Sequence, residues 1–590
     1  MSALGVLETL STDAAFSSEA SRPAVPGLGR DSSVATASVT AGFGAVDYLD
    51  EAITKSIEMT LDGAITAAAR TRSTTTLAGL AQAYEGAGRV EDAVAAAIEV
   101  LQWPSSGGMT SIDAVSERLA FEVLLRNGGL DFALEQSAEH ALAPSLKLKI
   151  ATALAVNGRL DEAKRYVGDN EGVARHAVLG YIQILDGKYA SAVSSLRNAL
   201  RENPDDAVSA LNLSIALWSL GSLKKALGAA LHAKRVAPGR QDVVVHLLDL
   251  LFAMGDIGRV KSELRALERS GAPMRAGATV AQARLKLLEN DIEHGTRLLE
   301  KASALAEEEQ DRDTLAEVRS NLVRIRAARS DANRSGSVAE LVELHREFPE
   351  SDVVVAVMAQ VANRRSDAPA LAGALGQVDH KANRARSAFV RYQISTLEGK
   401  ASEASSHALE WLGLEPDNPR AVTAALVALG IGEERWHEAA EIALRSMSAI
   451  RAEDGQDRSG LNNAAYVLAM DGRADAAIEL LASMASKSFV YKATLGLAYL
   501  ASGDVPTGMK LYRQAANEAE RKRDDSRSLM TAYQALIVRQ LGLLTESDSD
   551  MVKALSLPPY PLPDDWDDRP EFLRLQSVAA RHGYPWPLEI

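Results

Sequence analysis

Residues 187–204, "GKYASAVSSLRNALRENP", and residues 221–238, "GSLKKALGAALHAKRVAP", place the same residue types at the same intervals. Glycine recurs at 187 and 221, alanine at 192/226 and 199/233, and proline at 204/238, always 34 residues apart. A fixed period of this length is typical of repeat proteins, in which each repeat is one supersecondary unit. The two stretches therefore predict a repeat array.

Each repeat has the pattern of two helices joined by a tight turn. In residues 207–238, Gly221 suits the left-handed end of a first helix because it has no Cβ. Ala226 and Ala230 are four residues apart and so lie on one face of a second helix. Small side chains there let two antiparallel helices approach closely, and Pro238 ends the second helix.

These positions resemble the tetratricopeptide repeat, a helix hairpin with characteristic leucine, glycine, alanine and proline positions. In residues 207–238 the matching residues are Leu213, Ser214, Leu217, Gly221, Ala226, Ala230, Ala233 and Pro238. Comparable stretches surround Gly88, Gly158, Gly187, Gly399, Gly472 and Gly503. The resemblance implies an all-α fold, a superhelical array of antiparallel helix hairpins.

The chain of 590 residues divides by composition into three parts. Residues 1–46 are rich in Ser, Thr, Ala and Gly without helical periodicity, which predicts a flexible leader. Residues 47–545 carry the repeats, about a dozen hairpins at the family period. Between about 270 and 395 the repeats are degenerate, with Gly295 standing where alanine is expected.

Residues 546–590 form an acidic, proline-rich C-terminal segment with one short amphipathic helix. Phe572, Leu575 and Val578 lie on one face of that helix, which we expect to cap the last hairpin. A second interpretation concerns the terminal stretch "YPWPLEI", residues 584–590, which could dock as a lid in the groove of its own chain or in that of a neighbouring chain.

Composition and motifs argue against several function classes. The net charge of −15 disfavours nucleic-acid binding, and the absence of cysteine excludes disulfides and Cys-ligated zinc. We identify no phosphate-binding loop, no nucleophile elbow and no close histidine–carboxylate cluster, so we expect no enzyme, no cofactor and no metal. Acidic residues near the N-terminus and short apolar stretches predict a cytoplasmic protein without membrane insertion.

The family resemblance also implies where a partner would bind. Tetratricopeptide grooves are lined by the second, fifth, ninth and twelfth positions of the first helix of each hairpin. The apolar residues at these positions in three consecutive repeats are Tyr181, Ile184, Leu211, Ile215, Trp218, Val245 and Phe252. We predict that this apolar stripe binds a protein or peptide partner. The alternative is that the same side chains pack against neighbouring helices.

The sequence thus favours a non-catalytic scaffold or adaptor that holds a partner protein in the groove. Two other functions stay open. One is a ligand- or peptide-sensing regulatory subunit of a separately encoded enzyme or transcription complex. The other is an enzyme domain within residues 270–395, which a folded domain without hairpins would support.

Overall fold

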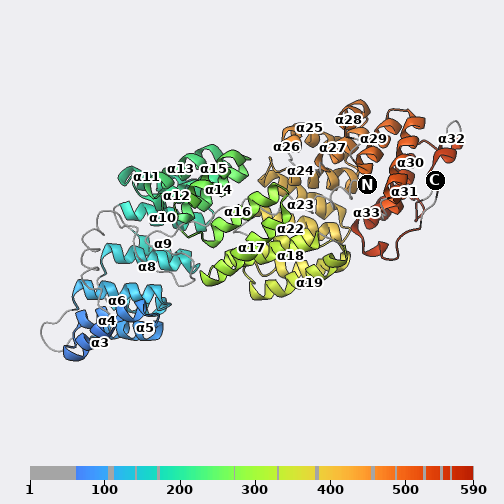
Figure 1. Cartoon of the computed structure of the whole chain (residues 1–590). Coiled ribbons are helices and arrows are strands. Elements are labelled where there is room, and N and C mark those ends of the chain that lie inside the picture. Colours follow the sequence, from blue (N-terminus) through green and yellow to red (C-terminus); the bar gives the residue numbers. More distant parts are fainter. Residues whose placement is uncertain are drawn as a thin grey trace. The chain divides into compact units, whose positions relative to one another are not determined.

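The computed structural model describes residues 61–103, 112–139, 142–168, 173–271, 273–328, 331–378, 384–452, 459–484, 488–521, 526–544, 549–558 and 561–588. The predicted leader, residues 1–46, lies outside these ranges. Throughout the described ranges the chain forms helices and turns and no strand (Figure 1). The predicted all-α fold of antiparallel helix hairpins is confirmed.

Two compact units make up the chain, with their boundary between residues 315 and 316. We call the described residues before this boundary the N-terminal unit and those after it the C-terminal unit, and we describe each separately.

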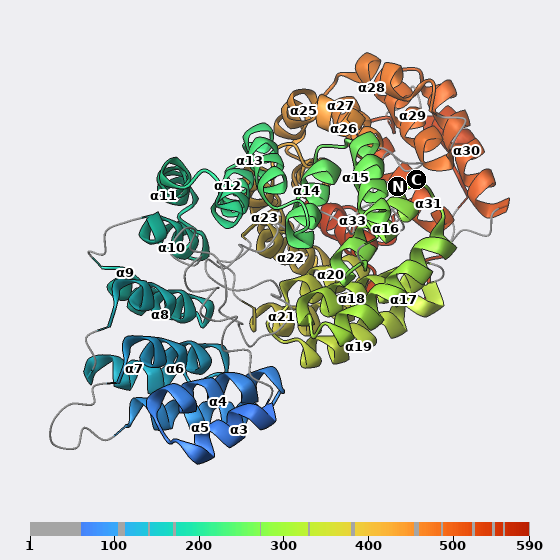
Figure 2. The same ribbon diagram turned by 60° about the vertical axis from the view of Figure 1, so that its left-hand side comes forward.

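The N-terminal unit begins with α3 (Leu61–Arg70) and continues as a series of helix pairs (Figure 2). The pairs are α4 (Thr74–Gly86) with α5 (Val90–Leu101), α6 (Ala114–Arg126) with α7 (Leu130–Glu139), α8 (Pro144–Val156) with α9 (Leu160–Val167), α10 (Val173–Leu185) with α11 (Tyr189–Glu202), α12 (Ala207–Ser219) with α13 (Leu223–Val236), α14 (Gln241–Ala253) with α15 (Ile257–Arg269), and α16 (Ala276–Leu288) with α17 (Ile292–Glu308).

The C-terminal unit continues the same architecture. Its helices are α18 (Arg312–Ala327, which spans the boundary), α19 (Asp331–Glu347), α20 (Asp352–Val361), α21 (Ala368–Leu375), α22 (Arg384–Leu397), α23 (Ala401–Leu414), α24 (Pro419–Leu426), α25 (Trp436–Arg445), α26 (Met447–Ala452), α27 (Ser459–Met470), α28 (Ala474–Leu481), α29 (Phe489–Ala501), α30 (Val505–Arg521), α31 (Ser526–Gln540), α32 (Ser549–Leu555) and α33 (Pro570–Arg581). Short 3-10 turns lie at η1 (Arg365–Asp367) and η3 (Trp566–Asp568), and α24 continues as the π-helix η2 (Val427–Gly432).

The turn between the two helices of a hairpin has one recurring geometry. At the end of α12, the Ser222 N–H donates to Leu217 O at 2.9 Å and the Gly221 N–H donates to Trp218 O at 2.7 Å. This pair of bonds is a Schellman motif and requires a left-handed residue, which Gly221 supplies with φ 71°. The hydrogen bonds therefore confirm the predicted role of Gly221.

The same left-handed residue follows the first helix of most hairpins. It is glycine, with φ between 68° and 91°, at Gly88, Gly128, Gly158, Gly187, Gly221, Gly255, Gly399, Gly472 and Gly503. At two equivalent turns it is not glycine: Asn290 has φ 61° and Glu434 has φ 60°. These two substitutions hide the repeat from a search based on glycine.

Glycines within helices serve a second purpose, which is close contact between the paired helices. A Cβ on Gly180 in α10 would lie 2.5 Å from Leu196 Cγ in α11. A Cβ on Gly295 in α17 would lie 2.6 Å from Leu287 Cδ2 in α16. The sequence suggested that Gly295 marks a degenerate repeat. In the structure, the α16–α17 hairpin is well formed, and its tight packing requires a glycine at this position.

The described parts of the degenerate region, 270–395, are themselves helical. They run from α16 to α22 with turns between them, and α16 packs against α17 as a hairpin. A domain of another architecture, which would have supported an enzyme there, is not found in the described part of this region.

We predict opposite effects on stability for alanine at Gly221 and at Gly228. Gly221→Ala forces a side chain into the left-handed region and should lower the free energy of unfolding by about 1 kcal/mol. Gly228 lies exposed within α13 with no atom within 4 Å of an added Cβ, so Gly228→Ala should raise it by about 1 kcal/mol. Denaturant unfolding of the two full-length variants measures both changes, and a shift of the same sign in both would contradict this account of the turn.

Candidate functional site

The predicted partner-binding stripe lies on α10, α12 and α14, but most of it is buried. Tyr181, Ile184, Leu211, Ile215 and Phe252 are each less than 9% exposed, and only Trp218 and Val245 are partly exposed. The sequence left open the alternative that these side chains pack between helices. In the described residues, five of the seven are buried in that way. A partner-binding role for the stripe stays a prediction, and Trp218 and Val245 are the members that a partner could reach.

Trp218 stacks at an angle on a buried histidine of the next hairpin. The ring centroids of Trp218 and His246 are 5.6 Å apart, and His246 Nε2 lies 2.8 Å from Ser214 Oγ. Because the Ser214 hydroxyl donates to Ala226 O at 2.7 Å, its oxygen accepts the proton that His246 carries on Nε2. Burial lowers the pKa of His246 to about 3, opposed by the charge of Asp242, so this imidazole is neutral.

The stripe ends at a charged residue on the following hairpin. The Arg284 guanidinium of α16 lies over the Phe252 ring, 4.2 Å from the centroid. Its Nη1 also approaches Asp249 Oδ1 at 3.7 Å. We call the surface formed by successive first helices of the N-terminal unit the first-helix face, and Arg284 places a cation on it beside the apolar stripe.

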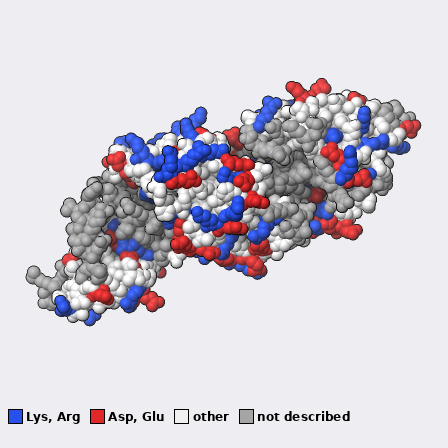
Figure 3. Space-filling view, in the orientation of Figure 1, with Lys and Arg blue, Asp and Glu red and all other residues white. Residues whose placement is uncertain are grey.

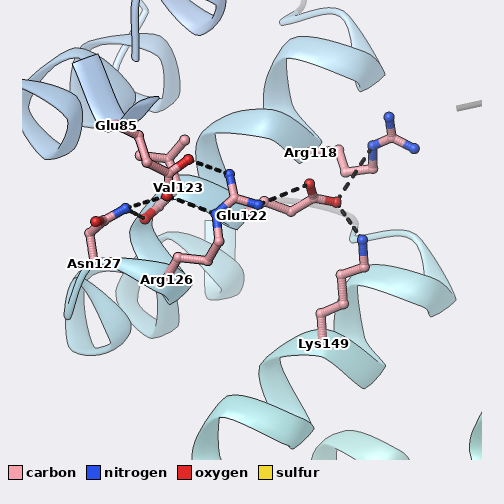
Figure 4. Close-up of polar contacts among 7 residues, drawn as sticks. All are labelled: Glu85, Arg118, Glu122, Val123, Arg126, Asn127 and Lys149. Atoms are coloured by element: carbon pink, nitrogen blue, oxygen red, sulfur yellow. Dashed lines mark hydrogen bonds and ion pairs between the residues drawn. The ribbon is translucent and has the colours of Figure 1, made fainter. Parts of the chain in front are cut away.

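A second group on this face escaped the sequence analysis. Glu85, Arg118, Glu122, Arg126 and Lys149 form a charged ladder across α4, α6 and α8 (Figure 4). Arg126 donates to both carboxylate oxygens of Glu85, at 2.8 and 2.7 Å, and its Nη1 lies 3.8 Å from Glu122 Oε2. Lys149 Nζ donates to Glu122 Oε1, and Arg118 Nε lies 3.8 Å from the same oxygen.

The ladder is largely removed from solvent. Glu122 is 7% exposed and Arg126 is 6% exposed. Burying charges costs solvation energy, which ion pairs in good geometry offset. Here three cations surround two carboxylates, and the amide of Asn127 also donates to Glu85 Oε1 at 2.7 Å. The ladder is therefore a set of largely buried ion pairs in which three cations share two carboxylates.

The ladder could have been found by counting back from the turns. Tyr181 lies six residues before the left-handed Gly187, and Glu122 lies six residues before Gly128. Arg118, ten residues before Gly128, occupies the position of Ala177. The register was hidden because Gly128 follows Gly88 by 40 residues and not by 34.

In the C-terminal unit the predicted helix of the C-terminal segment is present as α33, with Phe572, Leu575 and Val578 each 1% exposed. These side chains belong to the same hydrophobic cluster as Val427 of η2 and Leu536 of α31. Figure 1 shows α33 beside α31. The helix α33 thus packs against α31 and η2.

Acidic residues before α33 hold the segment at one end. Asp568 accepts hydrogen bonds from the Ser366 N–H at 2.7 Å and from Ser366 Oγ at 2.9 Å. Asp565 accepts from Arg364 Nη1 at 2.8 Å. Burial alone would raise the pKa of Asp565, but hydrogen bonds from Arg569 and Arg364 lower it, so the carboxylate is charged at neutral pH.

Residues after α33 hold the other end. Arg581 Nη2 donates to Gly432 O at 2.6 Å, and His582 Nε2 lies 2.8 Å from Glu434 Oε1. Glu434 is the left-handed residue of its turn, and its carboxylate also accepts from Gln540 of α31. The C-terminal segment is therefore bound at three successive places, by charged groups at both ends and by apolar groups between them.

No described helix is long and apolar enough to cross a membrane. Within the described ranges, no three His, Asp or Glu side chains are grouped as metal ligands would be.

We predict that Glu122→Gln destabilises the N-terminal unit by about 3 kcal/mol, because it leaves buried cations without their shared carboxylate. Glu91→Gln is the matched control, since Glu91 is exposed on α5, and should change stability by less than about 0.5 kcal/mol. Denaturant unfolding at low and high salt measures both. Equal effects for the two variants would show that the ladder contributes no more than a surface charge.

Acid should destabilise the chain through His246. The folded-state pKa of about 3 lies below the unfolded value, so between those values the unfolded state binds the extra proton. Above the unfolded-state pKa, His246 is neutral in both states and does not lower the free energy of unfolding. Between the unfolded-state and the folded-state pKa, each unit of acidification lowers the free energy of unfolding by about 1.4 kcal/mol. The measurement is the free energy of unfolding of wild type and of His246→Gln at pH 7 and at pH 5. The difference between the two proteins isolates the contribution of His246, because both contain the same carboxylates. A difference that does not change with pH would contradict it.

Comparison with known proteins gives structural likeness only. No family model matches the chain, and no curated protein matches it in sequence. Among solved structures, the APC/C hetero-tetramer Cut9–Hcn1 is similar at 12% identity and a TM-score of 0.45, over 87% of this chain and 96% of that one. A tetratricopeptide repeat protein from Parabacteroides merdae is similar at 15% identity and a TM-score of 0.34, over 42% of this chain and 100% of that one.

Yeast Tom70 is similar at 13% identity and a TM-score of 0.29, over 70% of this chain and 99% of that one. Identities this low concern the fold and not the function. The predicted resemblance rests on the hairpins themselves, with their left-handed turns and small residues at the contact between helices. This chain is built of tetratricopeptide-like helix hairpins.

Proposed function

We propose that the chain is a non-catalytic scaffold that binds a partner polypeptide on the first-helix face of its N-terminal unit. The observation that carries this proposal is the C-terminal segment, which the hairpins of the C-terminal unit hold through Phe572, Leu575 and Val578. Hairpins of this chain therefore offer a surface on which a polypeptide segment can bind. The N-terminal unit repeats the same architecture.

The N-terminal unit has suitable groups for such a contact. Trp218 is a partly exposed aromatic side chain held by His246, and aromatic side chains on rigid surfaces are frequent anchors of protein interfaces. Because the hairpins are preformed, binding does not require the scaffold to become ordered.

The proposed partner is a protein and not a nucleic acid. A net charge of −15 opposes binding to a phosphate backbone, and acidic and basic side chains lie interspersed over much of the face in Figure 3. The proposed compartment is the cytoplasm. Nothing in the described ranges specifically favours the alternative of a ligand-sensing regulatory subunit.

The test is chemical crosslinking and affinity capture of the full-length chain in its host, followed by mass spectrometry. Trp218→Ala/Val245→Ser should reduce capture of the main partner about tenfold, the scale of one lost anchor. Leu231→Ala, at a side chain 43% exposed on the second helix α13, should leave capture unchanged. Equal capture by both variants would place the interface elsewhere, and no specific capture by wild type would reject a scaffold function.

A further inference from the structure

The C-terminal segment, residues 561–588, contacts parts of the chain that a further repeat would not reach. In a repeat array each unit contacts its neighbours in sequence. Asp568 instead contacts Ser366, 202 residues earlier, and Arg581 contacts Gly432, 149 residues earlier. A Cβ added at Gly399 would lie 3.7 Å from the Cβ of Leu573, so the segment also passes close to the turn at Gly399. The segment thus crosses several hairpins, as a bound ligand does.

We propose that this surface, the docking edge formed by Arg364, Ser366, Gly399, Gly432 and Glu434, is a binding site for an amphipathic helix. The C-terminal segment occupies it within the same chain, and a partner's helix of the same chemistry displaces the segment. This inference rests on the proposed function, in which the hairpins bind polypeptide segments. It adds that the partner at this site is an amphipathic helix and that the C-terminal segment controls access to the site.

The occupant defines the chemistry that the docking edge recognises. Two carboxylates precede the helix and pair with Arg364 and Ser366. An aromatic and two aliphatic side chains follow at three-residue spacing and fill the apolar part of the site. A basic side chain and a histidine end the helix beside Gly432 and Glu434. A displacing helix has the same order of acidic, apolar and basic groups.

The occupant's polar contacts lie at the rim, which makes them weak individually. The side chains of Arg364 and Asp565 are 35% and 33% exposed, and those of Arg581 and His582 are 39% and 38% exposed. Ion pairs exposed to this degree contribute little each. They orient the segment but do not lock it in place.

The fit beneath the helix is also incomplete. Glu571 is 8% exposed, and burial raises its pKa, so keeping it ionised in the docked segment costs energy at neutral pH. A cavity of about 20 Å³ lies between α33 and the end of α22, lined in part by Tyr392, Lys400 and Arg574. Arg574 Nη1 is buried with no hydrogen-bond partner among the described residues. A partner with a neutral residue in place of Glu571 would therefore bind this edge more tightly than the chain's own segment does.

Glu434 shows how the site is built into the fold. It occupies a left-handed turn position, where glycine carries no penalty and a glutamate does. Its carboxylate contacts His582 and Gln540, so the side chain links the occupant to α31. The strained residue of this turn is thus also the residue that holds the segment.

The test uses a fluorescent peptide with the sequence of residues 561–588 as the probe and three full-length proteins. These are wild type, Asp565→Asn/Asp568→Asn, and the control Asp564→Asn/Asp567→Asn. Both variants remove two negative charges, but the control removes carboxylates that are exposed and make no described contact. Fluorescence anisotropy gives the affinities, and circular dichroism verifies that each protein is folded.

If the segment is a releasable occupant, weakening it in the chain leaves the edge open more often. The peptide should then bind Asp565→Asn/Asp568→Asn about tenfold more tightly than wild type or the control. A peptide carrying Phe572→Ala should not bind any of them, and this change cannot unfold the protein. Equal affinity for all three proteins, or no binding to any, would overturn the proposal.

Size-exclusion chromatography completes the test. A dimer formed by Asp565→Asn/Asp568→Asn would identify a second copy of the chain as the occupant and would also overturn it. Trp218→Ala/Val245→Ser tests the N-terminal unit, whereas the peptide experiment tests the C-terminal unit. A negative peptide result can therefore be distinguished from failure of the proposed function.

Discussion

The Schellman turn between paired helices requires a residue with positive φ, and the rest of each hairpin is placed relative to that residue. The N–H that follows it bonds to the carbonyl five residues earlier, which ends the first helix at a defined position. A side chain in this conformation costs about 1 kcal/mol or more, so glycine is favoured. Where glycine is absent, at Asn290 and Glu434, another gain has to offset that cost.

Once the turns are set, the chemistry of the first-helix face can vary without changing the fold. On α4, α6 and α8 that face carries a buried ion network, and on α10, α12 and α14 it carries packed apolar side chains. A buried network of this kind contributes less to stability than a hydrophobic core of the same volume, because desolvation opposes the attraction. Most of the stability of these hairpins therefore comes from the buried cluster beside the network, which is rich in alanine and leucine.

The sequence predicts the hairpins wherever glycine marks the turn, as at Gly187 and Gly221, because local conformation decides them. It fails where the same conformation is adopted by Glu434, since the compensating contacts come from His582, 148 residues later. The helix α33 was also predictable from its periodicity. Its binding partners were not, because nothing local connects Asp568 to Ser366. The burial of Tyr181 and Leu211 likewise depends on neighbouring hairpins.

Whether α33 is simply a cap depends on how far its contacts extend. A cap covers the exposed apolar face of the last hairpin and needs no contact with earlier ones. The C-terminal segment does contact α31, but its charged ends reach η1, the last residue of η2 and Glu434 in the turn that follows, all of which precede the last hairpins in the chain. Full burial of Phe572, Leu575 and Val578 contributes about 1.5–3 kcal/mol each, which keeps the segment docked in the free chain. Release therefore needs a competitor that supplies the same apolar contacts, and thermal fluctuation alone exposes the docking edge only rarely.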